Sequence, residues 1–344
     1  MSVDVVDIDP AGDIVLVCGQ GDNQKLLRVA SNVLSFGSPV FKTMLGPSFK
    51  EGKQLSVQGT LDLPLPDDDG GDMTIICDIL HLRHSKLSRR LDVEKLEDVS
   101  ILADKYNCTV ALGPIAEHWV RELRSACSDA TRVSLICSAF RLRLPLMFKE
   151  LGRDHILRHG APWQLEGDRP EHKMLQKVFD AAPNEAFIVR TKLGHFFDER
   201  IAAYCDTGRK APNNCFRGVK YGPDFVRTLK EAGLWPFHRA TGLTIEAIME
   251  KMRSIGWNQS LLSVANCNNR NMMGGAMGGA TSGACFCTLD LWNDNRTLAS
   301  LSEAEADRIT NEIPDLCLEC VLQGQYWKKT DCNHSQDPSL PFGL

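Results

Sequence analysis

Ten residues, Asp13-Ile-Val-Leu-Val-Cys-Gly-Gln-Gly-Asp22, set the fold of the amino-terminal third of the chain. The first six are rich in Ile and Val and predict a buried strand. The Gly and Asp residues that follow favour a turn. Residues 25–30 alternate weakly and are expected to return as the hairpin partner of that strand. Ser31 then stands where the N-cap of a helix belongs, so the pattern changes from strand to helix.

Helices and one more strand are expected after this hairpin. Pro39 suits the first position of a second helix, which Gly46-Pro47 stops. Residues 61–65 alternate apolar and polar side chains and predict a short edge strand, where Pro64 is tolerated. Three amphipathic helices follow, with apolar stripes over 73–80, 96–106 and 112–123, and Asp72 is expected to cap the first. Strands mixed with runs of helices indicate an α+β layer arrangement.

The rest of the chain predicts helices separated by loops. Residues 207–223 mix Gly, Pro, Asn and basic residues without periodicity, so we expect a loop there. Residues 266–283 are rich in Asn, Gly and Met and are expected to be flexible. The expected helices cover residues 131–158 with an interruption at Pro145, 166–197 with breaks near Pro170 and Pro183, 243–254, and 298–313.

Charge and hydropathy exclude several classes of protein. The 344 residues include 39 Lys and Arg against 44 Asp and Glu, a net charge of −5, so no nucleic-acid partner is expected. No apolar run approaches the roughly 20 residues of a membrane helix, so no membrane partner is expected either. Residues 1–10 contain three Asp and no Lys or Arg, unlike a secretory signal. We therefore expect an intracellular protein, in cytoplasm or nucleus, whose 13 Cys are thiols or metal ligands.

Seven short motifs, in this order, resemble a BTB/POZ domain, in particular its fungal branch. They are Gly12-Asp-Ile-Val-Leu-Val17, Leu27-Arg-Val-Ala-Ser31, Val33-Leu-Ser35, Ser38-Pro-Val-Phe41, Phe49-Lys-Glu-Gly52, Leu63-Pro-Leu-Pro-Asp-Asp68 and Leu102-Ala-Asp-Lys-Tyr-Asn-Cys108. The sequence departs from the family at Arg28, where His is frequent, and at Ala30, where a polar residue is usual. The resemblance implies a BTB/POZ-like α+β domain (12–124) and a helical extension (125–200). The pattern along the chain adds an acidic extension (1–11) and a mixed helical and flexible region (201–344).

The resemblance also implies a function in protein–protein interaction without catalysis. Two kinds of partner follow from it, another copy of the domain and a cullin scaffold of a ubiquitin ligase. In that role the chain is a substrate adaptor whose residues beyond about 160 recognise the target. The alternative is a BTB-type transcription or chromatin regulator, which requires a DNA-binding module that the sequence does not display.

Five apolar residues are the interface candidates: Leu34, Phe36, Phe41, Met44 and Phe49. The first four have helical spacing, which favours the core. In the family the first helices serve self-association, so the resemblance implies that one or two of them lie at an interface. Phe49 lies outside the stripe, and either packing under its loop or contact with a partner is open. Residues 3–8 alternate and suit an extra strand on a partner's edge. Because Asp4, Asp7 and Asp9 repel their symmetry mates, the first domain is expected to self-associate only weakly.

The sequence contains no catalytic motif, and its candidate metal ligands lie near the carboxyl terminus. His81 and His84 are three apart on an expected helix, but their basic neighbours indicate a solvated face. A structural zinc ion is the candidate cofactor, since zinc takes four N or S ligands. Cys285 and Cys287 are an alternative to Cys332 and His334 as the second pair of ligands. The alternative for the first pair, Cys317 and Cys320, is a helix that holds both cysteines in the core. The candidate ligands are Cys317, Cys320, Cys332 and His334.

Overall fold

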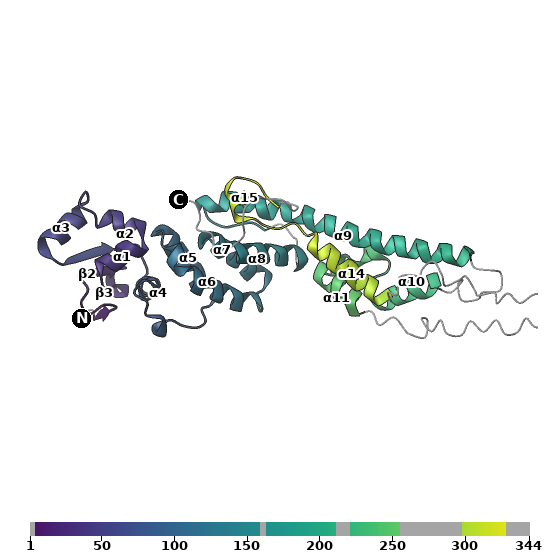
Figure 1. Ribbon diagram of the computed structural model, residues 1–344, viewed down its shortest axis with the longest axis horizontal. Coiled ribbons are helices and arrows are strands. Elements are labelled where there is room, and N and C mark those ends of the chain that lie inside the picture. The colour runs from purple at the N-terminus through teal and green to yellow at the C-terminus, as the bar shows by residue number, and fades with distance from the viewer. Residues whose placement is uncertain (1–3, 159–162, 211–220, 255–297, 328–344) are drawn as a thin grey trace, which may run out of the picture. The chain divides into compact units, whose positions relative to one another are not determined.

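The computed structural model describes residues 4–158, 163–210, 221–254 and 298–327 (Figure 1). They form a mixed α and β structure that is mostly helical, with one four-stranded sheet. They divide into two compact units. The first contains the described residues up to His155, Leu165–Val178 and those from Asp315 onward, and the second contains the remainder. This division follows packing, and the domain boundaries at 124 and 200 stay predictions.

The sheet confirms the hairpin and the edge strand expected from the sequence. Its strands, in the spatial order β1-β3-β2-β4, are β1 (Val5–Asp7), β3 (Lys25–Val29), β2 (Ile14–Cys18) and β4 (Leu61–Leu65). β2 and β3 are antiparallel, with Leu16 opposite Leu27, and β4 lies parallel to β2 at one edge. Side chains of β4 alternate between buried Leu and exposed residues, and Pro64 is among the exposed ones.

The amino-terminal strand pairs within its own chain, because β1 lies parallel to β3 with Val6 opposite Leu27. β1 is also an edge strand of the sheet, so its pairing with a partner's edge stays a prediction. Asp7 and Arg28, opposite each other, form an ion pair with 3.0 Å between Oδ1 and Nε. The charge of Asp7 is therefore paired with an arginine of its own chain, which the acidic sequence of residues 1–10 did not predict.

Most helices of the first unit follow the expected stripes, and α3 is an additional helix that the sequence pattern did not predict. They are α1 (Ser31–Gly37), α2 (Pro39–Met44), α3 (Lys50–Gln58), α4 (Gly70–Leu80), α5 (Val93–Lys105), α6 (Thr109–Arg124), α7 (Asp129–Arg141), α8 (Pro145–Arg158), the start of α9 (Pro170–Lys210) and α15 (Leu318–Leu322), with short 3₁₀ turns η1 (Gly21–Asn23) and η2 (His84–Lys86). α5 packs against α4, α6 and α7, which places Leu102 and Trp119 in the core. Pro145 begins α8, as the interruption at that residue predicted.

The cap of α4 is Asp69, and the expectation of Asp72 is wrong. The Asp69 carboxylate accepts hydrogen bonds from the backbone N–H groups of Gly71 and Asp72. Gly70 and Gly71 are already helical, so α4 begins before the expected cap Asp72. Asp72 is instead buried within the first turn, where the Lys95 ammonium lies 2.6 Å from its Oδ1.

The carboxyl-terminal segment from Asp315 to Trp327 packs in the first unit. Leu316 is buried against Gly152 of α8, where a Cβ on that glycine would lie 2.4 Å from Leu316 Cδ1. The Lys149 ammonium lies 2.7 Å from Asp315 Oδ2. Trp327 Nε1 donates to the Val178 carbonyl at 2.8 Å. Residues far apart in sequence therefore share one core.

The second unit contains the rest of α9 with α10 (Tyr221–Glu231), η3 (Phe237–Gly242), α11 (Ile245–Ser254) and α14 (Leu298–Asn311). The expected break at Pro183 is wrong, because α9 continues through it. Buried Ala182 and Ala186 on either side keep this stretch packed despite the amide that proline lacks. The expected loop over 207–223 is wrong at both ends, which belong to α9 and α10. The flexible segment predicted at 266–283 lies outside the described residues.

Candidate functional site

The structure separates the five interface candidates into core and surface. Leu34 and Phe41 are fully buried, and the Phe41 ring stacks on Tyr106 with 4.4 Å between centroids. Met44 is half-buried, and Phe49 is 47% exposed. Phe36 is 96% exposed on the last turn of α1. Helical spacing therefore identified the core at two positions, and Phe36 belongs to the surface.

Phe36 stands at the rim of an apolar groove of about 640 Å³, which we call the Phe36 groove. Three of the seven large apolar side chains exposed among the described residues line it: Phe36, Leu82 at 77% and Val110 at 89%. Its walls come from α1, the end of α4 and the start of α6. The lining residues are Val33, Phe36, Gly37, Ile79, Leu80, Leu82, His84, Val110, Ala111, Pro114 and Ile115.

Local backbone features shape the Phe36 groove. A Cβ at Gly37 would lie 2.5 Å from Leu80 Cδ2, so glycine lets the end of α1 approach α4 closely. Leu82 has a φ of 57°, in the left-handed region that costs a residue with a side chain roughly 1–2 kcal/mol. Arg83 N–H then donates to the Asp78 carbonyl at 2.7 Å and ends the helix. An apolar side chain is thus held at the surface by a strained turn.

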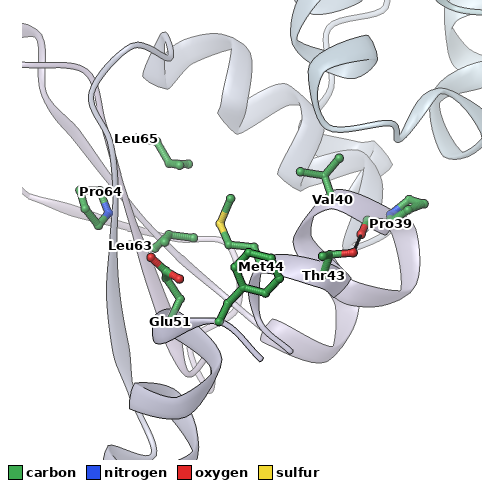
Figure 2. Close-up of a pocket in the computed structure, with 9 residues that line it drawn as sticks. Pro39, Val40, Thr43, Met44, Glu51, Leu63, Pro64 and Leu65 are labelled. Atoms are coloured by element: carbon green, nitrogen blue, oxygen red, sulfur yellow. Dashed lines mark hydrogen bonds between the residues drawn. The ribbon is translucent and has the colours of Figure 1, made fainter. Parts of the chain in front are cut away.

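A second apolar groove, of about 590 Å³, lies between α2, the start of α3 and the edge strand β4 (Figure 2). We call it the Phe49 groove. Glu51 supplies its charged side chain, and Figure 2 shows this carboxylate near Leu63 at one side of the groove, with Met44 lining the space opposite. The lining residues are Pro39, Val40, Thr43, Met44, Phe49, Glu51, Leu63, Pro64 and Leu65.

The two histidines of the expected solvated face have different surroundings. His84 is exposed, as predicted. The prediction is wrong for His81, whose Nε2 accepts the Ala30 N–H at 3.1 Å and whose Nδ1 donates to the Cys77 carbonyl at 2.8 Å. Burial lowers the pKa of His81, and the hydrogen bond to Cys77 opposes that shift. The two side chains are not neighbours on one helix, because α4 ends before them.

Of the seven cysteines whose side chains the structure describes, six are buried and Cys127 is half-buried. Cys317 and Cys320, two predicted zinc ligands, are buried at the start of α15. The other candidates, Cys332, His334, Cys285 and Cys287, lie outside the described residues. Within the described ranges no group of three or more His, Cys, Asp or Glu side chains is placed to hold a metal ion. The zinc site therefore stays a prediction.

Burial also decides the reactivity of the thiols in the first unit. Desolvation raises the pKa of Cys18, Cys108 and Cys137 to about 12 in each case, and it raises the pKa of Cys77 as well. The thiolate is the nucleophilic form, so at neutral pH these four side chains are inert thiols. None of the four has the partly exposed, electropositive surroundings that activate a cysteine nucleophile.

Sequence reasoning missed two of the three large apolar side chains that are exposed at the Phe36 groove, Leu82 and Val110. A signal existed for Val110, which lies off the buried stripe of Leu112 and Trp119 on α6. Leu82 gave no such signal, because its exposure follows from the backbone turn after α4. Both residues come together with Phe36 only in the folded chain.

Comparisons with known proteins identify no family for the chain. No protein-family model matches the chain, and no curated protein matches its sequence. Among the helices of the described residues, none combines the length and the apolar character needed to cross a membrane.

Proposed function

We propose that the chain is a non-enzymatic protein–protein interaction module of the BTB/POZ type. The observation that carries the proposal is the exposure of Phe36 on the rim of an apolar groove built by three helices. Burying a Phe side chain is worth about 1.5–3 kcal/mol. Exposed Phe36, Leu82 and Val110 together form the kind of apolar surface that marks interaction sites.

A second copy of the chain is the first partner we propose for the Phe36 groove. In a two-fold arrangement one patch meets its own copy, so Phe36 of each chain enters the groove of the other. The resemblance of the first domain supports this choice, since the first helices serve self-association in the family. Strand exchange is a weaker route, because β1 already pairs with β3 of its own chain.

A cullin scaffold is the partner we propose for the Phe49 groove. This groove is separate in sequence from the Phe36 groove, because its walls are α2, the start of α3 and β4. Its apolar lining and single carboxylate suit an amphipathic helix with a basic residue beside its apolar face. With a second copy bound at the Phe36 groove and a cullin bound at the Phe49 groove, the chain is a dimeric substrate adaptor. The alternative role, a transcription or chromatin regulator, has no described surface that favours it.

Light scattering of the full chain over a concentration series tests self-association. We expect the wild-type mass to rise from one to two chains, and the Phe36→Ser variant to stay monomeric. Val57→Ser is the matched control, since Val57 is 86% exposed and lies outside both grooves. A strictly monomeric wild type at high micromolar concentration would remove this part of the proposal.

Binding to a purified cullin amino-terminal domain tests the adaptor role separately. We expect binding that Phe49→Ser weakens and Phe36→Ser leaves unchanged. A parallel titration against labelled duplex DNA at physiological salt tests the alternative function. A chromatin regulator that binds DNA needs contacts to phosphates, and such a titration detects them. Micromolar DNA binding without cullin binding would favour the regulator.

A further inference from the structure

His81 joins two walls of the Phe36 groove by a pair of hydrogen bonds. It is the C-cap residue of α4, and its Nδ1 donates to the Cys77 carbonyl of that helix at 2.8 Å. Its Nε2 accepts the backbone N–H of Ala30, at the junction of β3 and α1, at 3.1 Å. An imidazole that accepts at Nε2 and donates at Nδ1 is neutral and has one defined tautomer.

The start of α1 depends on acceptors from outside the helix. Ala30 is its N-cap residue, and no side chain of the cap itself accepts a hydrogen bond from the first turn. Asp13 accepts both the N–H and the hydroxyl of Ser31, each at 2.7 Å. His81 accepts the preceding N–H. These two side chains therefore fix the first residues of α1, and α4 packs against both β3 and α1 (Figure 1).

Protonation of His81 is incompatible with this arrangement. An imidazolium ring has two N–H donors and no acceptor, so its Nε2–H would oppose the N–H of Ala30. The amide would lose its partner in a part-buried place, which carries a desolvation penalty. The hydrogen bond to Cys77 survives protonation, because Nδ1 donates in both forms. The contact that breaks is the one between α4 and α1.

The charged groups around His81 act in both directions. Asp9, from the turn after β1, and Asp78, on α4, favour the imidazolium, whereas Arg83, just after α4, opposes it. Arg83 Nε lies 3.4 Å from Asp78 Oδ1, which offsets part of the pull of that carboxylate. Asp13 is engaged with Ser31 of the same junction. Burial is the largest influence and lowers the pKa of His81 below its ordinary 6.5.

The lowered pKa of His81 determines how the contact between His81 and Ala30 responds to pH. A histidine whose pKa is lower in the closed state takes up a proton more readily once the contact opens. The closed contact is therefore fully present above pH ~6.5 and weakens as the pH falls below it. Each pH unit in that range favours the open form by up to about tenfold, because opening takes up one proton.

We propose that His81 is a pH-sensitive latch, whose protonation releases the start of α1 from the end of α4 and loosens the Phe36 groove. α1 contributes Val33 and Phe36 to the groove, and α4 contributes Ile79 and Leu80. A loosened groove loses the complementary surface that a second copy must meet. This consequence for self-association rests on the proposed function, but the latch itself does not.

Amide hydrogen exchange of the full chain between pH 7.5 and 5.5 tests the latch. After correction for intrinsic exchange, we expect the opening constant of the segment containing Ala30 to rise by up to about tenfold per pH unit below 6.5. His81→Gln abolishes this dependence, because a glutamine oxygen accepts the same N–H without titrating. His118→Gln, at an exposed position of α6 outside both grooves, is the matched control and keeps it. Equal pH dependence in wild type and His81→Gln overturns the proposal.

Nitrogen-15 NMR of the histidine side chains gives a second test on the wild-type chain, which holds even if His81→Gln does not fold. We expect His81 to carry its proton on Nδ1 at pH 7.5 and to titrate below the ordinary histidine value of about 6.5. A proton on Nε2, or titration at an ordinary value, overturns the latch. Light scattering separately reports association, so a monomeric chain with a working latch would overturn the dimer alone.

Discussion

The packing of Leu316 on Gly152 predicts a specific pattern in a double-mutant cycle. Leu316→Ala removes a fully buried side chain, which costs about 2–5 kcal/mol. Gly152→Ala places a methyl group 2.4 Å from Leu316 Cδ1 and 2.7 Å from Cγ, and such overpacking costs about 1–3 kcal/mol. Alanine recovers about 1 kcal/mol of helix propensity in α8. The single glycine change therefore costs up to about 2 kcal/mol.

The double variant should be more stable than the two single changes predict together. Once Leu316→Ala has removed Cδ1 and Cγ, the nearest atom to the methyl group that Gly152→Ala introduces is the Cβ at position 316, at 3.1 Å. Relief of that clash, while the gain in propensity stays, gives a coupling free energy of about 1–2 kcal/mol. Urea unfolding of the full-length variants, followed by far-UV circular dichroism, measures it through the shift of the midpoint.

Gly113→Ala on α6 serves as the control for glycine replacement in a helix. A Cβ there meets no atom within 4 Å, so a change within about 1 kcal/mol is expected, with part of the propensity gain lost before Pro114. Additivity of the Gly152 and Leu316 changes to within about 0.5 kcal/mol would refute the packing of the carboxyl-terminal segment on α8.

Three further predictions concern the core and the thiols. Leu102→Ala should cost about 2–5 kcal/mol, and a thermal melt that matches wild type would contradict the placement of α5 in the core. Because its pKa is raised to about 12, Cys18 should react with iodoacetamide at pH 8 only as fast as the chain unfolds, whereas rapid labelling of the native chain would show an exposed thiol. The predicted zinc site requires about one equivalent of zinc in protein purified without a tag, lost in the Cys317→Ser, Cys320→Ser double variant. Elemental analysis that finds less than about a tenth of an equivalent leaves these cysteines as core residues.

Local pattern determined much of the fold in advance. Alternation in residues 25–30 and 61–65 predicted strands that the structure contains, because a strand's two faces differ in burial every second residue. Stripes at helical spacing predicted α4 to α8 for the related reason that one side of each helix faces the core. Pro145 and Pro170, expected as an interruption and a break, are the first residues of α8 and α9, since proline needs no amide partner in a first turn.

Tertiary structure decided what local pattern leaves open. Phe36 and Phe41 are equally apolar and close in sequence, but one is exposed and the other stacks on Tyr106. The difference depends on which face of each helix packs against distant residues, such as Tyr106 after α5. Pro183 likewise fails to break α9, because the neighbouring buried residues outweigh one lost hydrogen bond.

The sequence by itself determined the hairpin, the edge strand, most of the buried stripes and the resemblance that suggested an interaction module. Only the folded chain brings Phe36, Leu82 and Val110 to one groove and sets His81 between α4 and α1. Secondary structure follows from interactions within a few residues, which a pattern records. A surface groove and a hydrogen bond across 51 residues follow from packing, where each side chain's exposure depends on the neighbours that the whole fold supplies.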